Sequence, residues 1–159
     1  MGTTRQSGYM YRAAKDFAGL ASLGYNDGNF LPKHVMAIVA NYALAAELLL
    51  KASDAKVIQS SRGRDGPLSQ AKIGSNAWGH KLSDVFDNLN PEVAKSLQTA
   101  FEEITSQPLV PLLEKCKDYF VNARYYYESG GSMYDVSGIK LLADGLDAAM
   151  WKAFGPIAE

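Results

Sequence analysis

The segment Pro32–Ala52 is apolar on almost every side of the helix that its spacing predicts. Its apolar residues recur at the intervals of three and four typical of an α-helix: Val35, Ile38, Val39, Tyr42, Ala45, Ala46 and Leu49. A helix that is apolar all round is buried by other elements, so we expect this segment at the centre of a helical protein. Asn41 and Glu47 interrupt it, so it contains no run of about 18 apolar residues of transmembrane type.

Five further segments show helical apolar periodicity. The spacing predicts helices over residues 8–23, 79–89, 91–107, 111–127 and 136–154. Asn90 and Pro91 have the residue types of an N-cap and a first helical position. The 21 Ala and 17 Leu, against 14 Val plus Ile, also favour helix over strand. We therefore predict an all-α protein: one domain of residues 1–159, folded as a single antiparallel up-and-down bundle of five to six helices.

Residues 53–79 lack any convincing periodicity and are rich in glycine. A connection of this length is either functional or mobile, so we expect a long loop here. From Lys56 to Lys81 the chain carries five basic residues and one acidic residue. Arg62 and Arg64 within this loop either contact phosphate or lie on a solvated surface.

Charge and cysteine content exclude several classes of protein. The 16 Lys+Arg and 17 Asp+Glu give a net charge of −1, which argues against a strongly basic nucleic-acid binder and against a membrane-surface protein held by charge. A single cysteine, Cys116, excludes an internal disulfide framework and cysteine-rich zinc sites, and its place on an apolar stripe predicts a buried thiol. The first residues lack a signal-peptide pattern, so we expect a cytoplasmic protein with no membrane association.

The sequence contains no recognisable metal or cofactor motif. Neither His34 nor His80 lies three residues after a glutamate, as a di-iron bundle requires. The glycines at 63 and 66 do not match a Walker A loop, and no strand is predicted before them. We expect no metal and no cofactor.

Two polar residues stand out in otherwise apolar or helical surroundings. Glu47 forms either an ordinary i,i+4 ion pair with Lys51 or a semi-buried carboxylate that fixes a neighbour such as Arg124 or His80. His80 follows Gly79 at the expected start of a short helix, where it is either a capping or packing residue or a polar member of a cleft between helices.

A run of aromatic residues follows Arg124 at a helix end. A cation near a helix C-terminus is favourable in itself. The next residues are Tyr125, Tyr126, Tyr127 and Glu128. Successive helical side chains point about 100° apart, so three tyrosines cannot all face the core. We expect at least one of them to be exposed, at an interface or against a ligand.

Three blocks in this order resemble the HEPN superfamily: residues 42–51 (YALAAELLLK), 79–86 (GHKLSDVF) and 120–128 (FVNARYYYE). The resemblance spans about residues 9–153 in helix order. It implies a small antiparallel helical bundle that is often a homodimer. Members of the family serve as ribonuclease toxins, as partners of minimal nucleotidyltransferases in toxin–antitoxin pairs, or as nucleotide-associated domains.

The chain departs from the ribonuclease members of that family at one point. Those members carry an arginine followed by a histidine within a few residues, whereas no histidine follows Arg124 and none lies near Arg5 or Arg12. Metal-free RNA cleavage needs a group that accepts the 2′-hydroxyl proton near neutral pH; histidine does this and arginine does not. His80 can replace the missing histidine only if the fold brings it to Arg124.

These observations favour a HEPN-like, dimeric module that binds a nucleotide, RNA or protein partner without catalysis. The candidate ligand-binding residues are Glu47, Lys51, His80, Arg124, Tyr125 and Glu128. The first alternative is a metal-independent ribonuclease of toxin or defence type, with His80 and Arg124 as a rearranged catalytic pair. The second is a purely structural dimerisation protein with the tyrosines at its interface and the polar residues as a satisfied buried network.

Overall fold

The computed structural model describes residues 6–58, 72–75, 79–129 and 133–157, with the backbone alone at 56–58, 72–75, 127 and 129. In these residues, eight helices and two short strands follow one another: α1 (Gly8–Asn26), α2 (Leu31–Ser53), β1 (Ala55–Ile58), β2 (Lys72–Ser75), α3 (Leu82–Asp87), α4 (Pro91–Thr105), α5 (Leu109–Cys116), α6 (Tyr119–Arg124), α7 (Tyr126–Ser129) and α8 (Val136–Phe154). The helices occupy the six regions in which the sequence predicts helix. The predicted helical class is confirmed.

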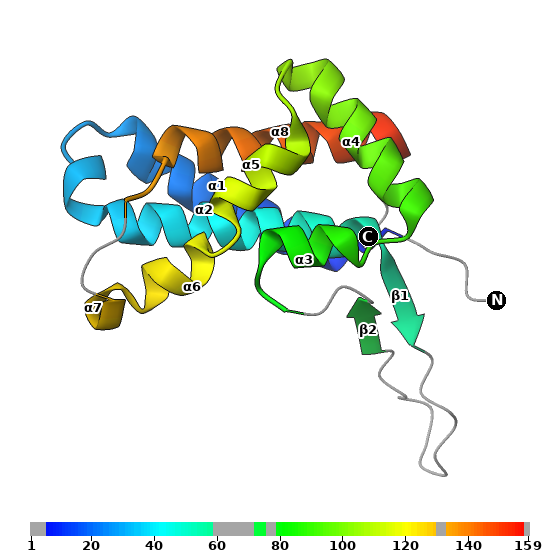
Figure 1. Cartoon of the computed structure of the whole chain (residues 1–159), viewed down its shortest axis with the longest axis horizontal. Coiled ribbons are helices and arrows are strands. Elements are labelled where there is room, and N and C mark those ends of the chain that lie inside the picture. The colour runs from blue at the N-terminus through cyan, green and yellow to red at the C-terminus, as the bar shows by residue number, and fades with distance from the viewer. Residues whose placement is uncertain (1–5, 59–71, 76–78, 130–132, 158–159) are drawn as a thin grey trace, which may run out of the picture.

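Helix α2 lies at the centre of the protein, as its apolar sequence predicts. It packs against α1 and α8 on one side and against α3 and α6 on the other (Figure 1). Its Tyr42, Leu49 and Leu50 are among the largest side chains that are fully buried. Helix α4 packs along α8, and α5 contacts α8, α3 and α4. One continuous apolar core joins these helices.

Helix α2 is also the one helix within the described residues that has the length and apolar composition to cross a membrane. Its apolar stretch has a mean hydropathy of 1.6, and 56% of that stretch is buried inside the protein. Four other helices cover α2, so its apolar character is accounted for by the core.

Local capping chemistry sets several helix starts where the sequence predicts them. The Asn90 side chain accepts a hydrogen bond from the Glu92 N–H at 2.9 Å, and Pro91 begins α4. Asp135 caps α8 by accepting from the Gly138 N–H at 2.8 Å. Such a cap satisfies an N–H that the helix itself leaves unpaired.

The single helix expected over residues 111–127 is wrong in detail, because the structure divides this region into α5, α6 and α7. Asp118 and Tyr125, with φ/ψ of −103°/5° and −110°/24°, stand outside helical geometry at the two breaks. Because the region is divided into short helices, neighbouring helices pack against different partners: α5 packs on α8, and α6 packs on α2. Apolar periodicity alone does not reveal such a change of direction.

The long loop expected over residues 53–79 also needs correction. Strands β1 and β2 pair antiparallel, from Ala55 opposite Ser75 to Ile58 opposite Lys72, and extend from the end of α2 (Figure 1). Strands of four residues are too short for a recognisable alternation, so the sequence did not predict them. Arg62 and Arg64 lie outside the described residues.

Cys116 is fully buried, as its position on an apolar stripe predicts. Burial, and secondarily the charge of Asp135, raises the pKa of the Cys116 thiol to about 12. A thiol with such a pKa is not a nucleophile near neutral pH, so Cys116 is a core residue.

Candidate functional site

Glu47 is the central residue of the site. It lies on α2 where that helix meets α3 and α6, and only 3% of it is exposed. An ionised carboxylate at this depth requires partners, because burial removes the water that would otherwise stabilise it. The structure supplies two of them, one from α2 itself and one from the segment that precedes α3.

Lys51 and His80 are these partners. The Lys51 ammonium group lies one helical turn along α2 and donates to Glu47 Oε1 at 2.7 Å. It also donates to the Gly79 carbonyl at 3.0 Å. His80 Nδ1 lies 3.2 Å from both carboxylate oxygens of Glu47. The two interpretations of Glu47 are therefore both realised: it pairs with Lys51 and it fixes His80.

The backbone at Gly79 makes this arrangement accessible. Gly79 has a φ of +98°, a conformation that side-chain-bearing residues rarely adopt. The turn delivers the Gly79 carbonyl to Lys51 and the next residue, His80, to Glu47. His80 does not cap α3, whose N-cap is Lys81, so its side chain serves the carboxylate instead.

An aromatic platform joins His80 to Arg124. The ring of Phe120 on α6 lies 5.6 Å from the His80 ring, centroid to centroid. The Arg124 guanidinium lies over the same Phe120 ring and over the Tyr125 ring, 5.2 Å from each centroid. Both cation–π distances fall within the range of an attractive contact. His80 and Arg124 therefore share one neighbouring ring, although they lie 44 residues apart in sequence.

We call the residues Glu47, Lys51, His80, Phe120, Arg124 and Tyr125 the Glu47 cluster. Five of them are candidates from the sequence. Arg124 and His80 were the two neighbours expected for the Glu47 carboxylate. The structure pairs His80 with Glu47 and does not pair Arg124 with it. Glu128, the sixth candidate, is exposed on α7, and within the described residues no hydrogen bond or ion pair links its side chain to the cluster.

Phe120 is the member that sequence reasoning missed as a site residue. In the sequence it stands out only as the first residue of the block 120–128. Its spacing of four residues from Arg124 was a usable signal, since side chains at i and i+4 meet on one face of a helix. Its contact with His80 depends on how α6 and the segment before α3 both meet α2, and no local pattern reports this.

The geometry gives each polar group of the cluster a defined role. The carboxylate accepts from His80 Nδ1–H, which places the imidazole proton on Nδ1. Nε2 makes no hydrogen bond to any residue in the described part of the chain, and the His80 side chain is 58% exposed. Because Lys51 offsets the charge of Glu47, the positive charge of Arg124 is left to face solvent beside Tyr125.

Among residues 6–58, 72–75, 79–129 and 133–157 there is no group of three His, Cys, Asp or Glu side chains placed to hold a metal ion. The cluster itself offers one carboxylate and one imidazole, and an ammonium group already occupies the carboxylate. It does not have the donor set of a metal centre.

Two tyrosines of the predicted run are exposed. Tyr125 is 39% exposed and Tyr126 is 48% exposed. The expectation that at least one would avoid the core is confirmed.

Comparison with known proteins adds no relative: no family model matches the chain, and no curated protein or solved structure matches it.

Proposed function

We propose that this protein is a HEPN-like helical module that binds a nucleotide or RNA through the Glu47 cluster without catalysis. The proposal includes the antiparallel up-and-down arrangement of that family, assembly as a homodimer and a cytoplasmic location. One observation carries it: a buried carboxylate holds His80 in place while His80 and Arg124 contact the same Phe120 ring.

Charge supports an anionic ligand. Glu47 and Lys51 offset each other, and Arg124 forms no ion pair with any described residue. An arginine held against aromatic rings keeps its planar set of N–H donors directed at a partner, which suits phosphate oxygens. His80 contacts the same Phe120 ring as Arg124, and its Nε2 makes no hydrogen bond within the described residues.

The partial exposure of the Tyr125 ring favours a ligand that carries a base. The Tyr125 ring is partly exposed next to the guanidinium group. Stacking of a base on an aromatic side chain contributes about 1–3 kcal/mol and does not depend on the identity of the base. Phosphate at Arg124 and a base on Tyr125 together describe a nucleotide unit.

Fluorescence anisotropy with a labelled single-stranded RNA tests this proposal. We expect Arg124→Ala to weaken binding by at least about tenfold, the loss of one charge-assisted contact. Arg12→Ala, on the exposed face of α1, is the matched control and is expected to leave binding unchanged. Equal affinity for wild type and Arg124→Ala would overturn the proposal, as would an absence of binding to RNA and to mononucleotides alike.

A metal-independent ribonuclease is the second candidate, favoured by the contact between Glu47 and His80 Nδ1. In this reaction, Nε2 takes the proton of a ribose 2′-hydroxyl, the oxygen attacks the adjacent phosphorus, and the 5′-oxygen leaves and takes a proton from water. Arg124 stabilises the charge that develops on the phosphoryl oxygens. Chelator-resistant RNA cleavage that both His80→Ala and Arg124→Ala abolish would establish it over the binding module.

A protein partner or a purely structural role predicts a third result. A minimal nucleotidyltransferase, the partner that the HEPN resemblance implies, would bind with no contribution from RNA. A structural dimer would neither bind nor cleave RNA in these assays, yet would retain its oligomeric state.

A further inference from the structure

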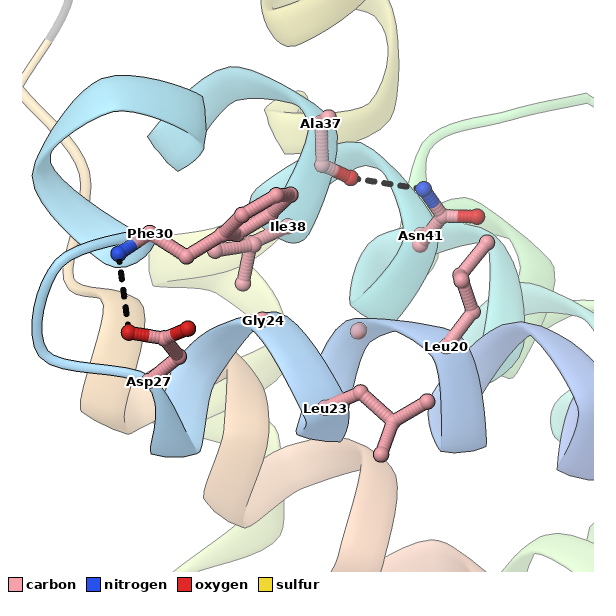
Figure 2. A pocket seen from close by; sticks show the side chains of 9 residues that line it. Leu20, Leu23, Gly24, Asp27, Phe30, Ala37, Ile38 and Asn41 are labelled. Atoms are coloured by element: carbon pink, nitrogen blue, oxygen red, sulfur yellow. Dashed lines mark hydrogen bonds between the residues drawn. The ribbon is translucent and has the colours of Figure 1, made fainter.

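An apolar hollow of about 420 Å³ lies where α1 turns into α2, away from the Glu47 cluster. Its lining includes Leu20, Leu23 and Gly24 from α1, Phe30 from the turn, and Ile38 and Asn41 from α2. Figure 2 shows Phe30 and Ile38 above Gly24, with Leu20 and Asp27 at opposite ends of the same stretch of α1. We call this surface the α1–α2 hollow. It shares no residue with the cluster.

The floor of the hollow is firmly packed. A Cβ added at Gly24 would come within 2.9 Å of two ring carbons of Phe30 and 3.1 Å of Ile38 Cδ1. The Phe30 ring also lies against the His34 ring, with centroids 4.0 Å apart. Phe30 is therefore held in place on both sides, and the hollow exists before anything binds to it.

The rim of the hollow leaves large apolar side chains in water. Leu23 is 75% exposed, Leu20 is 60% exposed and Phe30 is 41% exposed. A single exposed leucine is ordinary, but a contiguous apolar group beside a preformed hollow is typical of a protein interface. The protruding Leu23 and the hollow next to it form a knob and a hole within one patch.

Charge indicates what covers this patch. Asp27 and Lys33 lie at the turn and at the start of α2, both are exposed, and neither forms an ion pair within the described residues. Asp27 is otherwise engaged only as a cap, accepting from the N–H groups of Asn29 and Phe30 through one oxygen. A two-fold contact requires each surface to complement itself, with a knob for each hole and a cation for each anion. The patch carries one of each.

We propose that the α1–α2 hollow binds a second copy of this chain, with Leu23 of each copy in the hollow of the other and Asp27 facing Lys33 across the two-fold axis. Gly19 supports a close approach, since nothing lies within 4 Å of a Cβ added there and no contact inside the chain requires glycine. The inference rests on the homodimer included in the proposed function. The lining of the hollow includes neither a residue of the Glu47 cluster nor Tyr126.

Sedimentation velocity over a micromolar to millimolar series tests the interface. Leu23→Glu places a charge at the centre of the contact, and because Leu23 is largely exposed the fold should tolerate it. We expect the dimer dissociation constant to rise at least about thirtyfold, as for a hot-spot residue. Ile104→Glu, at a residue 43% exposed on α4, is the matched control and should leave the dimer intact.

Mixing two charge-reversal variants tests whether Asp27 of one copy faces Lys33 of the other. Asp27→Lys and Lys33→Asp each place like charges across the axis and are expected to weaken the dimer, whereas a mixture restores two opposite-charge pairs and should form a heterodimer. Labelling one variant with nitrogen-15 lets native mass spectrometry identify that species. A mixture that stays monomeric would contradict the pairing of Asp27 with Lys33 across the axis.

Other outcomes would overturn the interface. A wild-type protein that is monomeric throughout the series excludes it, and so does a dimer that Tyr126→Glu disrupts while Leu23→Glu does not. RNA binding measured on Leu23→Glu keeps the two proposals apart. RNA binding by a strictly monomeric wild type refutes the interface alone, and a Leu23-dependent dimer without RNA binding refutes the ligand proposal alone.

Discussion

The surroundings of the two ends of α2 depart from ordinary burial in opposite ways. Near its C-terminus, α2 carries a carboxylate into the interior, where Lys51 and His80 satisfy it. Near its N-terminus, α2 lies beside Leu20 and Leu23 of α1 and Phe30 of the turn, exposed apolar side chains that nothing in the described chain covers. A buried polar group and an exposed apolar patch are both uncommon, and both tend to mark function. The two proposals place ligand binding at one end of the helix and self-association at the other.

The largest expected effect comes from breaking the buried pair at the C-terminal end. Lys51→Met keeps the stem of the side chain but removes the cation from a carboxylate whose side chain is 4% exposed. Removing one partner of a buried pair costs about 3–5 kcal/mol of unfolding free energy. Urea denaturation at neutral pH measures the loss.

The double variant Glu47→Leu/Lys51→Met is its control. Replacing both partners by apolar residues of similar volume is often neutral, so most of the lost stability should return. A loss of less than about 1 kcal/mol in Lys51→Met alone would match an exposed pair and contradict the buried carboxylate.

Sequence reasoning reached these two ends of α2 unequally. The i,i+4 spacing of Glu47 and Lys51 and the apolar surroundings of Glu47 were enough to single out the carboxylate and to consider His80 as its partner. Whether His80 reached Glu47 depended on the turn at Gly79 and on the packing of α2, α3 and α6, which no local pattern encodes. The α1–α2 hollow was not predicted at all. It arises from the placement of Phe30 over Gly24 by a turn, whereas periodicity reports only which residues of a helix face inward.

Alanine substitution at two glycines of α1, Gly24 and Gly19, should change the free energy of unfolding in opposite directions. Gly24→Ala forces its Cβ against the Phe30 ring and should cost about 1–3 kcal/mol of stability, as overpacking does. Gly19→Ala enters open space and should stabilise the helix by up to about 1 kcal/mol, while weakening the proposed dimer. Thermal denaturation at low protein concentration, where the monomer dominates, measures the change in stability of both variants. Equal effects at the two positions would contradict the packed floor of the hollow.

The smallest loss of stability is expected at an exposed ion pair, which serves as the reference for the buried pair of Glu47 and Lys51. Lys115 Nζ lies 2.5 Å from Asp135 Oδ2, and their side chains are 56% and 34% exposed. Lys115→Met should cost less than about 1 kcal/mol, because solvent screens such a pair. A loss as large as that of Lys51→Met would remove the distinction between the two pairs.

This exposed pair also has a defined pH dependence. The hydrogen bond from Lys115, and next the bond from the Gly138 N–H, lowers the pKa of Asp135 below its usual 3.8. Since the folded pKa is lowered, its contribution to stability is complete above the unfolded value. It is lost as the pH falls below about 4 and through the folded pKa. Urea midpoints for wild type and Asp135→Asn should therefore differ less at acid pH than at neutral pH, and a constant difference would contradict the assignment.

The two histidines of the chain report on the two ends of α2 in one spectrum. His80 belongs to the Glu47 cluster, and His34 packs on Phe30 beside the hollow. The most direct measurement is a nitrogen-15 NMR titration of the imidazole nitrogens with single-stranded RNA, at a fixed protein concentration. If the Glu47 cluster binds the ligand, RNA shifts the His80 nitrogens and leaves those of His34 unchanged, and Arg124→Ala suppresses the shift. An RNA titration that moves neither histidine, or moves His34 alone, would contradict ligand binding at the Glu47 cluster.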